Sequence, residues 1–268
     1  MVLWLRIIIL AALSYALGNW SMARMVAWNS QTSNRVSITA KGSGNPGTMN
    51  MVRSFGWKKG IGTLILDVIK GAVPALLGNL LLEYGLDGKA FNPSALGVYV
   101  GGLAVVIGHM FPIAFRFRGG KGVACGIGVF LVADPFLMLI VFVLGFLVFL
   151  IFEYGFVASL TCILAMAVLE IVQIYTGRFF PVMKNPDWDR ITEVTKYVKT
   201  CVVLICVIFA LIYAAHWKNF QRLFTGKETR LSMRNAFKKL REKRNGGDSE
   251  TTDSDINTEN NKENEIVK

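Results

Sequence analysis

The stretch GVACGIGVFLVADPFLMLIVFVLGFLVFLIF, residues 122–152, contains 31 residues and a single charged side chain, that of Asp134. A helix of about 20 apolar residues crosses a bilayer, so this run is too long for one span and short for two. Asp134 and Pro135 form a turn signal within it, where proline also removes a backbone donor. We therefore predict two spans, 122–133 and 135–152, of which the first is short. One very long helix kinked at Pro135 is the alternative.

Further apolar runs on both sides of this stretch predict a protein that lies in a bilayer. The chain of 268 residues is 53% hydrophobic with a mean hydropathy of +0.46, which is too apolar for an ordinary soluble domain. The other predicted spans are residues 2–20, 60–82, 94–115, 155–176 and 198–217. The expected fold class is an all-α, polytopic integral membrane protein with about seven transmembrane helices and glycine-rich cytoplasmic loops.

Seven spans would place the ends of the first, third and seventh on one side of the membrane, next to glycine-rich or basic segments. By the positive-inside rule this side is cytoplasmic, so the N-terminus lies outside a plasma membrane and the C-terminus inside. The basic residues on this side are Arg24, Arg35, Lys41, Arg53, Lys58, Lys59, Arg116, Arg118 and Lys121. One loop, 177–197, disagrees, because it carries four basic and three acidic residues on the outer side.

The end of the chain differs from the rest in composition. Residues 229–244, TRLSMRNAFKKLREKR, place apolar side chains at roughly helical spacing among basic ones. This pattern fits a helix on an anionic leaflet, and a solvated charged helix fits it as well. Residues 245–268 are polar and predict disorder. The expected domains are a membrane-embedded domain over 1–228 and a cytoplasmic tail over 229–268.

The loop GSGNPGTMN, residues 42–50, is rich in glycine. Gly42, Gly44 and Gly47 satisfy GxGxxG, but a proline within the turn and a following membrane span do not fit a dinucleotide-binding βαβ unit. The glycines expose backbone N–H groups to an anion, and Ser43 and Asn45 add side-chain hydrogen bonds. A turn-rich connector is the plainer interpretation of this segment alone.

A second glycine-rich loop, RFRGGKGVA at residues 116–124, surrounds Lys121 with flexible backbone beside two arginines. It is not a Walker motif, because Gly122 stands where a Ser or Thr would bind magnesium, and nucleotide hydrolysis loses support. A basic loop at the membrane edge is the plainer alternative. The net charge of +11 suits anionic lipids or anionic substrates, and we expect no nucleic-acid partner.

Ionisable residues inside or near the spans supply further candidates. Asp67 and Lys70 are three residues apart on one helical face and are expected to form an internal, structural pair. Of the two histidines, His109 lies shortly before Pro112. It either organises the end of a helix or takes part in the chemistry. His216 is one helical turn from Asn219, so both could face one substrate. The four cysteines lie in apolar runs and are expected to be buried thiols; no zinc site is expected.

Three segments together resemble a known family. GSGNPGTMN continuing to Arg53, GHMFPIAFRFRGGKGVA (108–124) and HWKNFQRLFTGKE (216–228) are similar to the three signature motifs of the acyl-phosphate-dependent glycerol-3-phosphate acyltransferases of bacterial phospholipid synthesis, the PlsY family. The resemblance covers about residues 1–230, with the motifs in order. One position departs: where the family usually reads GATN, this chain has methionine, Met49, in place of the hydroxyl residue.

The resemblance implies an enzyme, an acyltransferase that moves an acyl chain from acyl phosphate to the 1-hydroxyl of glycerol 3-phosphate. It implies catalytic roles for Ser43, His216 and Asn219. It implies substrate-binding roles for Gly42, Asn45, Gly47, Asn50, Arg53, His109, Gly120, Lys121, Arg222 and Glu228. The expected partners are glycerol 3-phosphate, acyl phosphate and membrane lipids, for a monomer with neither cofactor nor metal.

Two other functions and another donor are weighed against this. The commoner acyltransferase design has an Asp five residues after its His, whereas Ala114 follows His109 and Gln221 follows His216 at that spacing. An acyl-CoA or acyl-carrier-protein donor is therefore not favoured. A transporter for phosphorylated small molecules is the alternative function, although such proteins often contain inverted repeats and none is visible here. A structural lipid-binding protein would leave the glycine loops unexplained.

Overall fold

The computed structural model describes residues 3–29, 37–83, 95–176 and 191–230, and these form helices and connecting loops without a strand. The chain divides into two units, Met1–Thr229 and Arg230–Lys268, and the fold below is that of the first. Its α-helices are α1 (Leu3–Gly18), α2 (Met22–Asn29), α3 (Thr48–Phe55), α4 (Trp57–Gly78), α5 (Leu96–Met110), α6 (Val123–Ala133), α7 (Pro135–Phe152), α8 (Gly155–Thr176), α9 (Ile191–Ala214) and α10 (Trp217–Phe224). Short helices η1 (Ile38–Ala40), η2 (Asn79–Glu83) and η3 (Ile113–Phe115) join them. The predicted all-α class is confirmed.

The apolar stretch 122–152 forms two helices rather than one kinked helix. Asp134 ends α6 in an extended conformation (φ −145°, ψ 95°) and caps α7, because its side chain accepts a hydrogen bond from the Leu137 N–H at 2.8 Å. Pro135 occupies the first turn of α7, where its missing N–H costs nothing. The predicted break between 122–133 and 135–152 is therefore confirmed.

Six of the described helical segments are long and apolar enough to cross a membrane. They are Leu3–Asn29, Trp57–Leu82, Leu96–Phe115, Pro135–Phe152, Gly155–Tyr175 and Tyr197–Ala214. The remaining apolar helix, Val123–Ala133, is shorter than a bilayer requires. The predicted count of seven spans is thus not established by helix length, although the part of the chain that the structure describes contains seven apolar helical segments.

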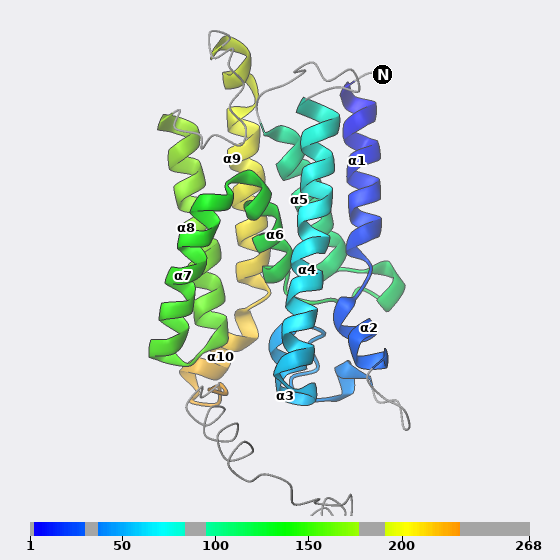
Figure 1. The fold of residues 1–268 in the computed structure, drawn as a ribbon, viewed down its shortest axis with the longest axis vertical. Coiled ribbons are helices and arrows are strands. Elements are labelled where there is room, and N and C mark those ends of the chain that lie inside the picture. The colour runs from blue at the N-terminus through cyan, green and yellow to red at the C-terminus, as the bar shows by residue number, and fades with distance from the viewer. Residues whose placement is uncertain (1–2, 30–36, 84–94, 177–190, 231–268) are drawn as a thin grey trace, which may run out of the picture. The chain divides into compact units, whose positions relative to one another are not determined.

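The three motif segments lie toward one end of the helices. In Figure 1, α1 starts at the end marked N, and α2, α3 and α10 lie together at the other end. The predicted tail over 229–268 lies almost wholly outside the described residues, as do Arg178, Lys184 and Arg190 of the loop that disagreed with the orientation. The structure therefore brings together the segments that the sequence pattern placed on one side.

Glycines allow the helices to approach closely. A methyl group on Gly71 of α4 would overlap the backbone of Cys125 in α6, and one on Gly128 would overlap the backbone of Val68 in α4. Gly18 and Gly108 play the same part between α1 and α5. Small residues at helix interfaces are the usual means of packing in lipid, where association gains little from hiding apolar surface.

The core lies between α5, α6, α8 and α9, around Tyr99, Phe130 and Ile208, while large apolar side chains of α7 face outward. Three of the four cysteines are buried as predicted. Cys206 is exposed on α9, so the prediction of a buried thiol is wrong for this residue. The apolar run gave no sign of this, because in a bilayer both faces of a helix can be apolar.

The contact between α4 and α6 generates a test. We expect Gly71→Ala to lower the thermal unfolding midpoint in detergent by several degrees, because overpacking costs about 1–3 kcal/mol. Gly62→Ala is the matched control, since it lies on the same helix with open space where a methyl group would be. It should leave the midpoint unchanged or raise it slightly. Equal midpoints for the two variants would show that the close approach is not required.

Candidate active site

The first glycine loop is held in place by a buried asparagine. Gly42 and Gly44 have φ values of +56° and +70°, which side chains disfavour. The Asn50 side chain accepts a hydrogen bond from the Ser43 N–H at 3.0 Å and donates to the carbonyls of Ile38 and Lys41 at 3.2 and 2.9 Å. Asn50 therefore fixes the backbone of the loop, and its own side chain is not available to a ligand.

The same loop leads into the start of α3. Gly47 is the N-cap residue and offers no side chain to the first turn of α3, whose backbone N–H groups remain able to bind an anion. Met49, which departs from the family pattern, packs against Gly155 at the start of α8. Its thioether therefore serves helix packing at a position where the pattern has a hydroxyl.

The second glycine loop folds back over the end of α5. The N–H groups of Gly119 and Gly120 donate to the carbonyls of Met110 and His109 at 3.2 and 3.1 Å. A methyl group on Gly119 would overlap the His109 carbonyl, and one on Gly120 would overlap the His109 ring. Glycine is thus required at both positions, and the next residue, Lys121, is placed by His109.

His109 belongs to a buried charged network beneath this loop. The Lys70 ammonium lies 3.1 Å from Asp67 Oδ1 and 2.9 Å from His109 Nδ1, and it also donates to the Trp20 carbonyl at 2.7 Å. Because an ammonium only donates, His109 Nδ1 accepts, and the ring proton lies on Nε2. The predicted Asp67–Lys70 pair is confirmed.

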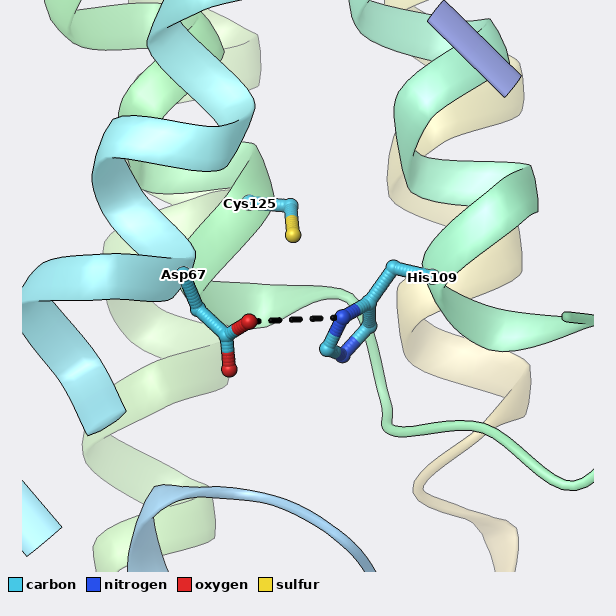
Figure 2. Close-up of side chains that lie close together, drawn as sticks. All are labelled: Asp67, His109 and Cys125. Carbon is cyan, nitrogen blue, oxygen red and sulfur yellow. Dashed lines mark ion pairs between the residues drawn. The ribbon is translucent and has the colours of Figure 1, made fainter. Parts of the chain in front are cut away.

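Asp67, His109 and Cys125 also lie close enough together to suggest a metal site (Figure 2). Figure 2 shows the Asp67 carboxylate facing the His109 ring. The distance between Asp67 Oδ1 and His109 Nδ1 is 3.7 Å. The Lys70 ammonium lies 3.1 Å from Asp67 Oδ1 and 2.9 Å from His109 Nδ1, so it would repel a metal ion bound by these two atoms. The group is therefore assigned as an ion pair.

The third segment contributes α10 and the residues after it. His216 precedes α10 and is buried, with its ring stacked on Phe156. Its Nδ1 is 2.8 Å from the Ile212 carbonyl; because a carbonyl only accepts, Nδ1 carries the proton and Nε2 a lone pair. Burial and the nearby charge of Lys121 lower the pKa of His216 to about 4. The imidazole is therefore neutral at physiological pH.

Asn219 and Glu228 link the basic groups into a chain of hydrogen bonds. Lys121 Nζ donates to Asn219 Oδ1, and Asn219 Nδ2 donates to Glu228 Oε1 at 2.9 Å. The other Glu228 oxygen accepts from Arg222 Nε at 2.7 Å. The Glu228 side chain is buried, so this is not the ordinary surface pair that an Arg–Glu spacing suggests. Arg53, from α3, donates to the Thr229 carbonyl at 3.2 Å.

A cavity of about 720 Å³ lies where the three segments meet. The predicted site residues that line it are Ser43, Asn45, Gly120, Lys121, Asn219 and Arg222. The predicted residues that do not line it are Gly42, Gly47, Asn50, Arg53, His109, His216 and Glu228. The lining includes six Arg or Lys residues and, among the described residues, neither Asp nor Glu. Such a cavity favours anions.

Five polar residues of the lining were not among the predicted site residues. They are Arg24, Thr39, Arg116, Arg118 and Lys218. Arg116, Arg118 and Lys218 lie within the motifs, so their position beside the glycine loop and α10 was a usable signal. Arg24 carried none, because a basic residue at the end of a first span is ordinarily read as a topology signal.

The pKa of Lys121 is strongly lowered by its surroundings in the cavity. Burial, and then the positive charge of Arg222, lowers its pKa to about 8, and Arg53 acts in the same direction while Glu228 opposes it. Burial also lowers the pKa of Arg53. The cavity therefore brings together cations whose repulsion an anionic ligand would relieve.

Comparisons with known proteins show the family to which the chain belongs. The sequence model of a family described as glycerol-3-phosphate acyltransferase matches residues 8–226. A glycerol-3-phosphate acyltransferase of Coxiella burnetii (strain RSA 493 / Nine Mile phase I) is 31% identical over 84% of this chain and 98% of its own length. The enzyme of the same name from Aquifex aeolicus (strain VF5) is 30% identical over 84% of this chain and its full length.

Solved structures are similar as well. The crystal structure of PlsY, an integral membrane glycerol 3-phosphate acyltransferase, in its glycerol 3-phosphate form matches 86% of this chain and 98% of that chain. The TM-score is 0.67 and the identity 28%. The lysophosphatidic acid form matches with a TM-score of 0.63 and 29% identity. The chain therefore belongs to the glycerol-3-phosphate acyltransferase family, and the resemblance inferred from its three motifs is confirmed.

The buried network beneath the second loop predicts a large effect on stability. Lys70→Met leaves the Asp67 carboxylate buried without its partner, which costs about 3–5 kcal/mol. We expect a marked fall in the thermal unfolding midpoint in detergent. The double variant Asp67→Asn/Lys70→Met removes both charges and should recover much of the loss. A single variant as stable as the wild-type protein would contradict a structural role for the pair.

Proposed function

We propose that this chain, as a member of the glycerol-3-phosphate acyltransferase family, transfers a fatty acyl chain from acyl phosphate to the 1-hydroxyl of glycerol 3-phosphate. The products are lysophosphatidic acid and inorganic phosphate, in phospholipid biosynthesis. The observation that carries the proposal is the basic cavity of about 720 Å³ at which three separated motif segments meet. Both proposed substrates carry phosphate, and charge-assisted hydrogen bonds from Arg and Lys are the natural means of holding them.

Lys121, Arg53 and Ser43 are proposed to hold the phosphate of glycerol 3-phosphate. Ser43 and Lys121 line the cavity, and Arg53 interacts electrostatically with Lys121. A phosphate dianion would restore the charge that burial makes costly on Lys121. Asn219 and Arg222 then place their polar groups beside the glycerol part, with Glu228 orienting both.

The acyl phosphate is proposed to bind where the first loop enters α3. The backbone from Gly47 to Asn50 forms the start of this helix; the Gly47 N–H donates to the Asn45 carbonyl at 2.9 Å, and no side chain caps the N–H groups that follow. Preorganised N–H donors stabilise the oxyanion that develops when a carbonyl is attacked. Gly42 and Asn50 support this backbone, Asn45 lines the cavity beside it, and the outward apolar faces of the spans accept the acyl chain from the bilayer.

The reaction forms one bond and breaks another at the acyl carbon. The 1-hydroxyl oxygen bonds to this carbon, and the bond from the carbon to the phosphate oxygen breaks, releasing phosphate as a good leaving group. The hydroxyl proton is proposed to pass to the departing phosphate, because a pKa of about 4 makes His216 a weak base. Neutral His216, which does not line the cavity, would instead help to orient the glycerol part by positioning Asn219, whose backbone N–H donates to the His216 carbonyl at 2.8 Å. Binding both reactants in this geometry supplies much of the acceleration.

The chain is a multi-pass membrane protein, and its orientation is part of the proposal. The motif segments and the C-terminus are proposed to be cytoplasmic and the N-terminus outside the plasma membrane, supported by the basic residues around the cavity. The acyltransferase domain is proposed to cover residues 1–228, with 229–268 as a cytoplasmic tail. A monomer is proposed, because one chain contributes all three segments of the cavity.

The donor is tested by supplying glycerol 3-phosphate with either palmitoyl phosphate or palmitoyl-CoA to the purified protein in lipid mesophase. Lysophosphatidic acid, identified by mass, is expected only with palmitoyl phosphate. Lys121→Ala should lower turnover by about 100-fold or more, since it removes charge-assisted bonds to phosphate. Lys58→Ala, which removes an exposed lysine away from the cavity, is the control. Product from palmitoyl-CoA would overturn the donor. Glycerol 3-phosphate binding without transfer from either donor would favour the transporter.

Lys121 also predicts a pH dependence. Its pKa of about 8 means that the ammonium predominates below pH 8 and is lost above it. We therefore expect kcat/KM for glycerol 3-phosphate, which reports ionisations of the free enzyme, to fall as the pH rises through about 8. In Lys121→Arg the charge persists, so this fall should disappear from the remaining activity. A fall near pH 8 that persists in Lys121→Arg would assign it to another group.

A further inference from the structure

Arg24, on α2, is a cavity residue that the motifs do not include. Its guanidinium lies over the Phe115 ring at 4.1 Å from the centroid, and Nη2 donates to the Arg118 carbonyl at 2.6 Å. Its Nη1 is buried without a hydrogen-bond partner, and no ion pair to Arg24 occurs in the part of the chain that the structure describes. Arg24 is thus held in place but not neutralised.

Arg24 differs from Lys121 and Arg222 in the segment that carries it. It belongs to the first candidate span, Leu3–Asn29, and its ring partner Phe115 ends the third, Leu96–Phe115. The chain of hydrogen bonds from Lys121 to Arg222 lies in segments outside the candidate spans. Large apolar side chains near Phe115 and Arg24 in sequence, those of Trp20, Ile113 and Phe117, are exposed. Arg24 therefore marks the wall of the cavity that adjoins the membrane.

We propose that Arg24 binds the phosphate of the acyl donor, at a subsite separate from that of glycerol 3-phosphate. The inference rests on the proposed function, which supplies two phosphorylated substrates. Of these, the donor is amphiphilic: its chain stays among the apolar side chains of the spans while its phosphate stays at their edge. A guanidinium suits this position, because it is weakly hydrated and presents several donors in a plane to the oxygens of phosphate.

Two features make Arg24 suitable for this task before the donor arrives. The contact with Phe115 and the bond to the Arg118 carbonyl orient the guanidinium, so less side-chain freedom is lost on binding. A partly buried cation without a carboxylate partner is unfavourable, and an arriving phosphate relieves this cost. The subsite would also connect the donor to the second glycine loop, through the carbonyl of Arg118.

The test separates the two substrates kinetically. We expect Arg24→Gln, which keeps a hydrogen-bonding side chain but removes the charge, to raise KM for palmitoyl phosphate about 10- to 100-fold. KM for glycerol 3-phosphate should stay within about twofold of the wild-type value. A merely structural defect would instead affect the kinetics with both substrates. Arg24→Lys should recover part of the loss. Arg6→Gln is the control, because it also removes an arginine from the first candidate span. Arg6 donates to the Leu81 carbonyl and does not line the cavity.

A second measurement tests phosphate binding by Arg24 independently of whether acyl phosphate is the donor. Hexadecyl phosphate, a non-reactive amphiphile with the same head group, is titrated against wild-type and Arg24→Gln protein, with binding followed by thermal stabilisation. Weaker binding to Arg24→Gln supports the subsite even if the wild-type protein makes no product from palmitoyl phosphate, in which case only the donor is wrong. Unchanged hexadecyl phosphate binding, or a rise in KM for glycerol 3-phosphate instead, would overturn the role of Arg24.

Discussion

The buried ammonium of Lys70 is the interaction on which the site depends. It lies on α4 and contacts the Asp67 carboxylate, the His109 ring of α5 and the Trp20 carbonyl that follows α1. In an apolar environment none of these groups can turn to water, so they make these contacts only when the three segments are in register. His109 in turn lies under Gly119 and Gly120, which place Lys121. An ion pair within the helices thus sets the position of a cation in the cavity.

The charges of the cavity, unlike the Asp67–Lys70 pair, are mostly cationic. Within the bundle Lys70 and Asp67 compensate each other, whereas the cavity gathers six Arg or Lys residues, of which Arg222 is paired with the Glu228 carboxylate. Burial lowers the pKa of Lys121 because the charged form is costly there, and a phosphate removes that cost. In the proposed function, affinity for phosphate would therefore come from an arrangement that is unfavourable in the free protein and relieved in the complex.

Much of this could be predicted from the sequence, and the failures have physical reasons. The break at Asp134 and the pair of Asp67 and Lys70 follow from local rules, a turn signal and helical spacing. The ring of His216 could not be placed, because its orientation depends on Phe156, distant in sequence, as well as on the Ile212 carbonyl.

Arg24 and Met49 show the same limit of sequence reasoning. Arg24 and Phe115 are 91 positions apart in the sequence, and no spacing rule predicts a contact over that distance. The packing of Met49 against Gly155 likewise appears only when α3 and α8 meet. In both cases the residue type is ordinary for its segment, and tertiary contact alone gives it a role.

The position of the cavity fits the proposed function, in which a few groups serve two unlike substrates. One is small and soluble in water, and the other carries a chain that is soluble only in the bilayer. A cavity bounded by the ends of candidate spans on one side and by α10 on the other would meet each proposed substrate in its own phase. The glycine loops are suited to this boundary because they present backbone N–H groups without bulky side chains. In the proposed reaction both substrates would then meet at a single carbonyl carbon, and their orientation, without a covalent intermediate, would lower the barrier.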